Sequence, residues 1–256
     1  MFQRAIVRAP SANFAEGLTT VDLGWPIYER AIEQHRAYCL ALERCGLDVL
    51  RLEPEPRYPD ATFVEDTAVL TERGAVLTRP GAPSRAGEVA GIRTILSEIY
   101  PELQSITEPG TLDGGDVCEA GNHFFIGISE RTNEAGAQQL AGVLSSLGYS
   151  ASFVDIRGVA GILHLKSGLA WLGDDELVVI EALRNHTEFQ RFNLVSVAAG
   201  EEYAANCVRV NDQVLIAAGY PNLEATLRQR GYHTVALDMS EFQKMDGGLS
   251  CLSVRF

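Results

Sequence analysis

The alternation of apolar and polar residues repeats itself along this chain. Four segments each contain an alternating strand, a tight turn and a second strand, which is the pattern of a β-hairpin; they span residues 65–78, 114–127, 166–179 and 204–217. Three of the four turns contain turn-forming residues, in the runs ERG, AGN and GDD. The segments begin 38 to 52 residues apart, which is the period range of repeat architectures rather than of separate domains.

Helical stretches and a further strand follow these hairpins. Residues 87–100 and 132–149 carry apolar side chains at helical spacing, and residues 223–232 end near a glycine, as helices commonly do. Short alternating stretches follow at residues 149–156 and 233–239. Each unit is therefore predicted to be ββαβ, an α/β repeat of about 40 to 50 residues.

The last repeat is incomplete, because residues 247–256 supply a first strand and then the chain ends. The missing parts match the start of the chain, where residues 2–10 predict a strand, 26–46 a helix and 47–52 a third strand. We therefore expect a single-domain α/β propeller of five blades over residues 1–256, with the ring closed by both chain ends so that sheet edges are removed. The alternative is a doubly wound sheet decorated with hairpins.

Composition narrows the class of protein. The net charge of −13 argues against nucleic-acid binding, which needs a basic surface. The N-terminus lacks the apolar run of a signal peptide, and no stretch has the length of a membrane span, so we expect a cytoplasmic chain without membrane contact. The five cysteines are odd in number and form no C-x-x-C motif, so we expect thiols rather than disulfides or a zinc site.

The repeat register gathers polar residues at one place. In a ring of five blades, the starts of all five first strands lie around the centre, and these starts carry a set of carboxylates together with one histidine and one or two cysteines: Asp60, Glu65, Asp66, Asp113, Asp116, His164, Cys207 and Cys251. Buried carboxylates need a cation. Ca²⁺ or Mg²⁺ would use such oxygens but has no need of a thiol and an imidazole, whereas a guanidinium ion suits all of these groups.

Cys251 and His164 are the candidate nucleophile and acid/base pair. Cys251 lies in a predicted strand behind Gly247 and Gly248, which we expect to let the backbone approach a ligand and adopt unusual dihedral angles. Cys207 is its counterpart in the neighbouring repeat and lacks these glycines. The structural alternatives are a buried core histidine at position 164 and aspartates that only cap turns, at Asp60 and Asp116.

The motifs FVEDTAVLTERGAVLTRPG, TLDGGDVCEAGNHFFIGISERTNEAGA, LHLKSGLAWL, YAANCVRVNDQVLIAAGYP and DGGLSCLSVRF resemble those of dimethylarginine dimethylaminohydrolases, guanidine-modifying enzymes of the pentein superfamily. The resemblance covers nearly the whole chain. It implies a five-bladed α/β propeller and the hydrolysis of asymmetric dimethylarginine or monomethylarginine to citrulline and a methylated amine. It also implies a small cationic substrate and no cofactor or metal. A homodimer is compatible with it.

The resemblance also implies a role for individual residues. Cys251 would be the nucleophile, His164 the general acid/base and Asp113 the third catalytic residue, at a position where some bacterial members have Glu. The substrate-binding residues would be Leu18, Asp60, Glu65, Asp66, Arg85, Arg131 and Leu249. Of these, Leu18 matches a mobile loop that covers the pocket, and the two arginines match positions that bind the substrate's α-carboxylate. The reaction would pass through a covalent S-alkylthiouronium on Cys251.

Two other functions fit parts of the sequence. An arginine deiminase would use the same three catalytic residues on unmethylated arginine, but these enzymes typically carry an inserted helical domain for which 256 residues leave no room. A non-catalytic pentein that acts as a binding module would have no need of Cys251, His164 and the carboxylates together.

Overall fold

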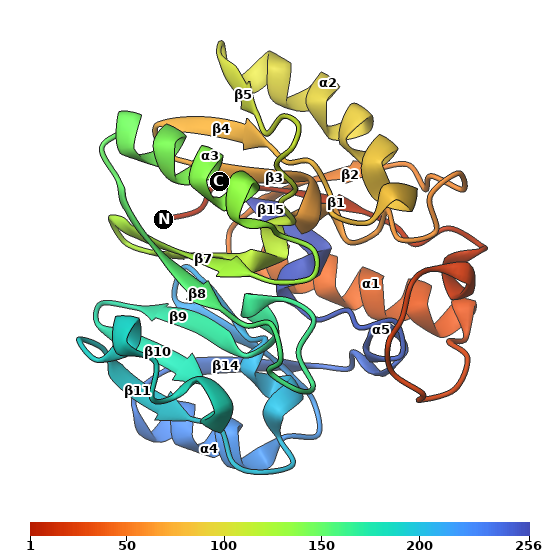
Figure 1. Ribbon diagram of the computed structural model, residues 1–256. Coiled ribbons are helices and arrows are strands. Elements are labelled where there is room, and N and C mark those ends of the chain that lie inside the picture. Colours follow the sequence, from red (N-terminus) through yellow and green to blue (C-terminus); the bar gives the residue numbers. More distant parts are fainter. The chain divides into compact units, whose positions relative to one another are not determined.

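The computed structural model describes all 256 residues (Figure 1). The chain forms two compact units. The first unit contains residues 1–64 and 197–256, and the second contains residues 65–196. The single catalytic domain over residues 1–256 stays a prediction.

The second unit holds three sheets and two α-helices. Its strands are β3 (Ala68–Thr71), β4 (Gly74–Leu77), β5 (Leu103–Ser105), β6 (Val117–Ala120), β7 (His123–Ile128), β8 (Ser150–Asp155), β9 (Leu169–Gly173), β10 (Glu176–Val179) and β11 (Asn193–Ser196), and its helices are α2 (Val89–Ile99) and α3 (Glu134–Ser146). Apolar side chains from β6, β7 and α3 pack together in one buried cluster that includes Phe124, Ile126 and Leu140. This core supports the turns that carry the polar residues of the site.

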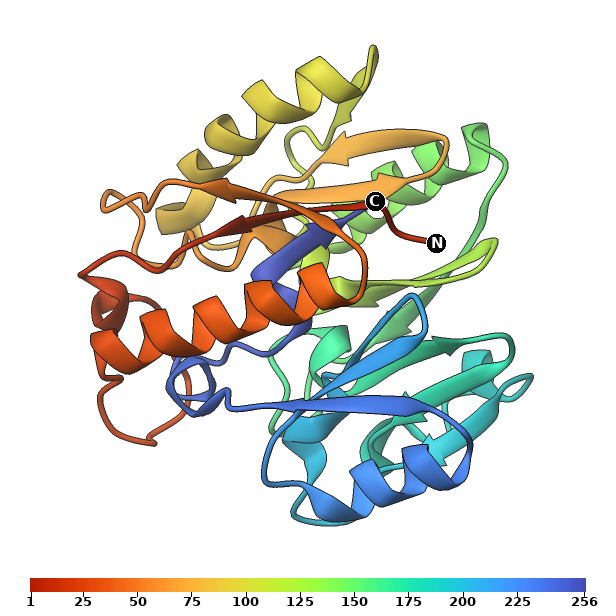
Figure 2. The same cartoon turned by 180° about the vertical axis from the view of Figure 1, so that it is seen from behind.

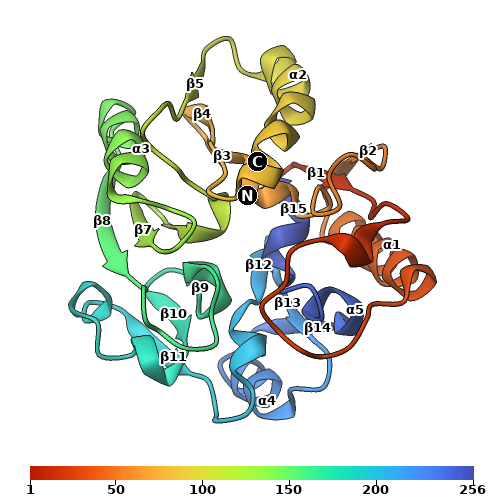
Figure 3. The same ribbon diagram turned by 45° about the vertical axis from the view of Figure 1, so that its right-hand side comes forward.

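The first unit holds the two remaining sheets. Its elements are β1 (Arg4–Arg8), α1 (Tyr28–Arg44), β2 (Asp48–Leu52), β12 (Val208–Val210), β13 (Gln213–Ala217), α4 (Pro221–Gln229), β14 (His233–Leu237), α5 (Ser240–Gln243) and β15 (Ser253–Arg255). In Figure 3, α4 lies beside the sheet of β12, β13 and β14. The buried core of this unit includes Tyr38, Phe242 and Leu252.

All five sheets have the same topology. Each has three strands, in the orders β15-β1-β2, β3-β4-β5, β6-β7-β8, β9-β10-β11 and β12-β13-β14. In every sheet the middle strand pairs antiparallel with the first strand and parallel with the third. This repeated order confirms the predicted fold class and excludes one doubly wound sheet.

The two chain ends share one sheet, as the incomplete last repeat predicted. Strand β15 pairs antiparallel with β1, with Ile6 opposite Val254. In Figure 2 the blue strand β15 lies beside the red strand β1, close to both termini. The N-terminal segment therefore supplies the second strand, the helix and the third strand of the repeat that the C-terminus begins.

The repeat of β9, β10 and β11 differs from the predicted ββαβ unit. It has no α-helix; two short 3₁₀ helices, Glu181–Leu183 and Thr187–Phe189, take its place. Its connection spans only residues 180–192, too few for a helix of several turns with entry and exit loops. In the first unit, His35 is buried within α1.

A 3₁₀ turn precedes the first strand of each sheet. These five turns are Val64–Thr67, Gly114–Asp116, Leu165–Ser167, Glu202–Ala205 and Ser250–Leu252. Cys251 therefore lies in a turn rather than in a strand, which corrects the prediction. No helix of the chain has both the length and the apolar character that crossing a membrane requires.

Candidate active site

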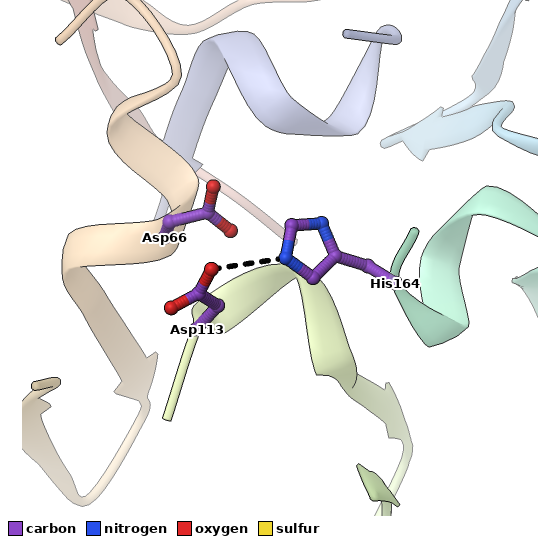
Figure 4. Close-up of side chains that lie close together, drawn as sticks. All are labelled: Asp66, Asp113 and His164. Atoms are coloured by element: carbon purple, nitrogen blue, oxygen red, sulfur yellow. Dashed lines mark hydrogen bonds and ion pairs between the residues drawn. The ribbon is translucent and has the colours of Figure 1, made fainter. Parts of the chain in front are cut away.

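A buried histidine and a buried aspartate form the centre of the site in the second unit (Figure 4). Nε2 of His164 lies 3.0 Å from Oδ2 of Asp113. The second oxygen of Asp113 accepts a hydrogen bond from the backbone N–H of Gly81 at 2.8 Å, so both oxygens of this carboxylate are bound. Asp113 comes directly before one 3₁₀ turn and His164 directly before another, so each side chain leaves the backbone from a fixed position.

Asp66 lies beside Asp113 and faces the same imidazole, as Figure 4 shows. Its carboxylate accepts the backbone N–H of Gly115 at 2.9 Å and an N–H of Arg85 at 2.6 Å. Position 115 has to be glycine, because a Cβ there would lie 2.8 Å from Nδ1 of His164 and 2.9 Å from Oδ1 of Asp66. The motif TLDGGD thus allows the close approach of the two carboxylates and the ring.

A third carboxylate fastens the turn that follows His164. Asp116 is fully buried and accepts hydrogen bonds from the hydroxyls of Ser129 and Thr132, each at 2.6 Å. Its other oxygen accepts the backbone N–H of Leu165 at 2.9 Å. One oxygen of Asp116 therefore holds the backbone that follows His164, while its other oxygen binds the hydroxyls of Ser129 and Thr132.

These carboxylates set the protonation state of the imidazole. Burial alone would lower the pKa of His164, but the charges of Asp66 and Asp116 and the hydrogen bond with Asp113 outweigh it and raise the pKa to about 9. Burial would likewise raise the pKa of Asp66, but His164 and Arg85 hold it at about 2. Burial raises the pKa of Asp116 above its ordinary value. At neutral pH, His164 is therefore a cationic proton donor beside an ionised Asp66.

Arg85 lies inside this network rather than at its surface. Its guanidinium binds Asp66 on one side and Glu88 on the other, with N–H to oxygen distances of 2.6 to 3.2 Å. All three side chains are buried. Sequence reasoning missed Glu88, although a glutamate three residues after an arginine is the spacing of a helical ion pair.

The other predicted substrate-binding residues of this unit differ in their contacts. Glu65 is buried and forms an ion pair with Lys166 at 2.7 Å. Arg131 is half-buried, and its guanidinium forms neither a hydrogen bond nor an ion pair. Its backbone packs on Gly81, where a Cβ would lie 2.1 Å from the carbonyl oxygen of Arg131. Arg131 is thus held near Asp113 by its backbone while its charge stays available for an anion.

Asp66, Asp113 and His164 are also the one group of side chains whose spacing could hold a metal ion, with ligand atoms within 4.8 Å of one another. Both oxygens of Asp66 already receive N–H donors, from Gly115 and Arg85. A metal would have to displace a buried arginine that has a second carboxylate partner. The N–H groups that already bind Asp66 therefore favour hydrogen bonds within the protein over a bound metal ion.

In the first unit, the turn that carries Cys251 is held by two side chains from the neighbouring repeat. Asn206 accepts the backbone N–H of Ser250 at 2.9 Å and donates to its hydroxyl at 3.1 Å. The hydroxyl of Tyr203 donates to the carbonyl of Gly247 at 2.8 Å. Cys251 itself is 8% exposed. Asn206 and Tyr203 were not predicted as site residues, although Asn206 directly precedes Cys207, the repeat counterpart of Cys251, and Tyr203 lies in the same turn region.

Gly247 and Gly248 are required by close packing in the protein, not by the unusual dihedral angles that we predicted for them. Neither adopts a positive φ, and it is Asp246 that has the left-handed backbone, with φ of 57°. A Cβ at Gly247 would lie 2.2 Å from the ring of Phe63, and one at Gly248 would lie 2.6 Å from the side chain of Asn206. The glycines therefore allow close packing against the protein itself.

The remaining predicted residues of the first unit are Leu18, Asp60 and Leu249. The backbone N–H of Leu18 donates to both carboxylate oxygens of Asp60, at 3.0 and 3.2 Å. Gly17 packs so closely that a Cβ would lie 2.4 Å from the same carboxylate. Leu249 is fully buried in the core of this unit.

Comparisons with known proteins agree with one another. A family model described as arginine deiminase matches residues 33–201. The chain is 43% identical to the N(G),N(G)-dimethylarginine dimethylaminohydrolase of Pseudomonas aeruginosa, with 100% of both chains covered. It is 37% identical to the protein of the same name from Streptomyces coelicolor, over 99% of this chain and 96% of that one.

The structural comparison gives the same result. A solved structure of the Pseudomonas aeruginosa enzyme, a cysteine-to-serine variant complexed with citrulline, matches with a TM-score of 0.97 at 42% identity, with 100% of both chains covered. The fold class is therefore that of the pentein enzymes, as the resemblance implied.

Proposed function

Because the chain belongs to the arginine deiminase family, as one of the dimethylarginine dimethylaminohydrolases, we propose that it hydrolyses Nω-methylated arginines to citrulline and a methylated amine. The observation that carries this proposal is the buried pair of His164 and Asp113, 3.0 Å apart. The raised pKa of His164, about 9, supplies a proton donor at neutral pH for an amine leaving group.

The reaction has two halves. The thiolate of Cys251 attacks the guanidinium carbon, and His164 gives its proton to the departing methylamine or dimethylamine, which leaves a covalent S-alkylthiouronium. His164, now neutral, takes a proton from water, and the hydroxide adds to the same carbon. The carbon–sulfur bond then breaks, which releases citrulline and restores the thiolate. The reaction requires the thiol and the imidazole to face the same carbon.

Asp113 orients the imidazole and stabilises its cationic form, because one of its oxygens faces Nε2 while the other is fixed by Gly81. Asp66 is ionised and lies beside the ring, where it can bind a guanidinium N–H. Glu65 supplies a further buried carboxylate that can bind the same guanidinium group. To do so, it has to divide its hydrogen bonds between the substrate and Lys166.

The α-amino acid end of the substrate would be bound by other residues. Arg131 is the best-placed partner for the α-carboxylate, because its guanidinium has no competing anion in the structure. Arg85 can share in this only while it keeps Asp66 and Glu88, so we propose that it acts mainly through Asp66. The backbones of Leu18 and Leu249 and the carboxylate of Asp60 remain candidates for the amino end.

We also propose a cytoplasmic location and a role in arginine metabolism. All five cysteine side chains are reduced thiols, which suits a reducing compartment. A homodimer stays compatible with the sequence.

The proposal is tested by measuring citrulline released from asymmetric dimethylarginine, monomethylarginine and arginine. We expect turnover of the two methylated substrates by the wild type, its loss in Cys251→Ser, and its retention in Cys207→Ser, which changes the equivalent thiol of the neighbouring repeat. Turnover of arginine alone would instead make the protein a deiminase. No citrulline from any of the three would favour a binding module.

A further inference from the structure

The segment that carries Leu18 is held by polar contacts rather than by a core. Residues 17–26, here called the strap, connect a 3₁₀ helix (Phe14–Glu16) with α1 and contain no helix or strand. Four of its apolar residues are exposed: Leu18 by 41%, Val21 by 37%, Leu23 by 52% and Trp25 by 78%. Since these side chains bury little surface, hydrophobic packing contributes little to the position of the strap.

Two carboxylates bind the strap backbone near its start. Asp60 accepts the N–H of Leu18 with both oxygens. Two residues later, Asp246 accepts the backbone N–H of Thr20 with one oxygen and the hydroxyl of Thr20 with the other, the latter at 3.2 Å. Leu18 therefore lies beside one carboxylate anchor and two residues before a second.

The later anchors come from the same short stretch as Asp246. The hydroxyl of Thr19 donates to the carbonyl of Lys244 at 3.0 Å, and the ammonium of Lys244 donates to the carbonyl of Trp25 at 3.4 Å. The backbone N–H of Ile27, just after the strap, donates to Glu241 at 2.7 Å. In Figures 1 and 3 the strap accordingly runs past α5. Residues 241–246 lead directly into the turn of Cys251.

The backbone of Asp246 makes this anchor unusual. Its φ of 57° is left-handed, a conformation that glycine adopts more easily than any other residue. Two glycines follow at once in the sequence, and neither takes the left-handed position. The backbone of Asp246 is therefore strained relative to that of a glycine at the same position. The two hydrogen bonds that its carboxylate accepts from Thr20 offset this strain.

We propose that Asp246 is a positioning residue for substrate binding: by holding Thr20, it fixes the strap so that Leu18 is in place before the substrate arrives. The proposal rests on the proposed function in one respect, because it takes Leu18 as a substrate contact. Without Asp246 the strap keeps its other anchors but becomes mobile around Thr20, and the substrate has to order it on binding. Binding weakens, while the chemical step on a bound substrate changes little.

The test uses two substitutions that suit a left-handed backbone. Asp246→Gly removes the carboxylate and relieves the strain, and Asp246→Asn keeps the shape but can accept only one of the two donors. Asp174→Gly is the matched control, since Asp174 also has a left-handed backbone, with φ of 45°, and lies exposed in the turn between β9 and β10. All variants are made in a Trp171→Phe background, which leaves Trp25 in the strap as the only tryptophan.

Two measurements are made on each variant: the fluorescence anisotropy decay of Trp25 without substrate, and kcat and KM for asymmetric dimethylarginine. For Asp246→Gly we expect faster nanosecond motion of Trp25 and a KM about tenfold higher, the usual effect of losing a charge-assisted hydrogen bond, with kcat changed less than about threefold. Asp246→Asn is expected to lie between it and the wild type. Asp174→Gly is expected to match the wild type in both measurements.

Unchanged motion of Trp25 in both Asp246 variants would overturn the proposal, as would looser motion with an unchanged KM. A fall in kcat at constant KM would also overturn it, because it would place Asp246 in the chemistry rather than in binding. If the wild type turned over no guanidine substrate, the proposed function would fail, and the anisotropy would still decide whether Asp246 holds the strap.

Discussion

Replacing Asp113 with asparagine tests the electrostatic account of the imidazole. The carboxamide oxygen can still accept the N–H of Gly81, while its NH₂ group then faces Nε2 of His164. The substitution therefore removes a buried negative charge 3.0 Å from the ring and replaces an acceptor with a donor, which favours the neutral imidazole. We expect the pKa of His164 to fall from about 9 by about 1–3 pH units.

The same change alters how stability depends on pH. In the wild type, the folded pKa of His164 lies above the ordinary value of 6.5, so the folded chain holds this proton more tightly than the unfolded chain. The resulting stabilisation is complete below about pH 6.5 and is lost as the pH rises through about 9. At about 1.4 kcal/mol per pH unit, it amounts to roughly 3 kcal/mol. Asp113→Asn is expected to remove a large part of this dependence.

The assay is an NMR titration of ¹³C-labelled histidine, with His164 assigned from a His164→Asn spectrum and with urea unfolding at matched pH values. Asp155→Asn is the control, because it removes an exposed carboxylate of the same unit. A wild-type His164 that titrates near 6.5 would refute the reasoning. So would a pKa that is the same in the wild type and in Asp113→Asn.

Three further predictions concern single side chains. Asn206→Ala removes two hydrogen bonds to the turn that carries Cys251, each worth about 1 kcal/mol. In steady-state assays we expect a kcat about tenfold lower at unchanged KM. The control Asn222→Ala, at an exposed site, is expected to keep the wild-type kcat. Gly115→Ala forces a Cβ against the imidazole and is expected to cost about 1–3 kcal/mol in urea unfolding, whereas Gly142→Ala, with open space in α3, is expected to stabilise slightly. Burial, together with the charge of Arg51, lowers the pKa of His35 to about 4. The folded chain is therefore expected to lose stability as the pH falls from 6.5 toward 4, because the unfolded chain binds this proton more tightly. His35→Leu should reduce this loss in urea unfolding, and an unchanged pH dependence in the variant would contradict the prediction.

The repeat pattern predicted most of the fold because the same strand order recurs five times. Hairpin turns with glycine, asparagine and aspartate were recognised in the sequence, and Gly121 and Asp174 in these turns do adopt positive φ. The absence of an α-helix in the third repeat was not predicted, because we assumed the same ββαβ unit for every repeat. The connection between β10 and β11 is too short for that helix. The 3₁₀ turns were not visible either, since three residues carry too little periodicity to separate a turn from a strand end.

The candidate site was predicted in outline for the same reason. Register placed Asp113, Asp116 and His164 at equivalent positions of adjacent repeats, and their contacts join these turns in the second unit. The burial of Arg85 could not be predicted, because it depends on its contact with Asp66, which forms only in the folded chain. Asp246 was missed because its left-handed backbone is a property of the folded chain, and the sequence offered two glycines as more obvious candidates.

In the proposed reaction, Cys251 forms a covalent bond with the guanidinium carbon of the substrate. Intact-protein and peptide mass spectrometry of enzyme quenched with acid during turnover of asymmetric dimethylarginine tests it directly. We predict a mass increase equal to the substrate minus dimethylamine, located on the peptide that contains Cys251 and absent from Cys251→Ser. The same adduct on Cys207, or rapid turnover with no adduct on any cysteine, would contradict the account.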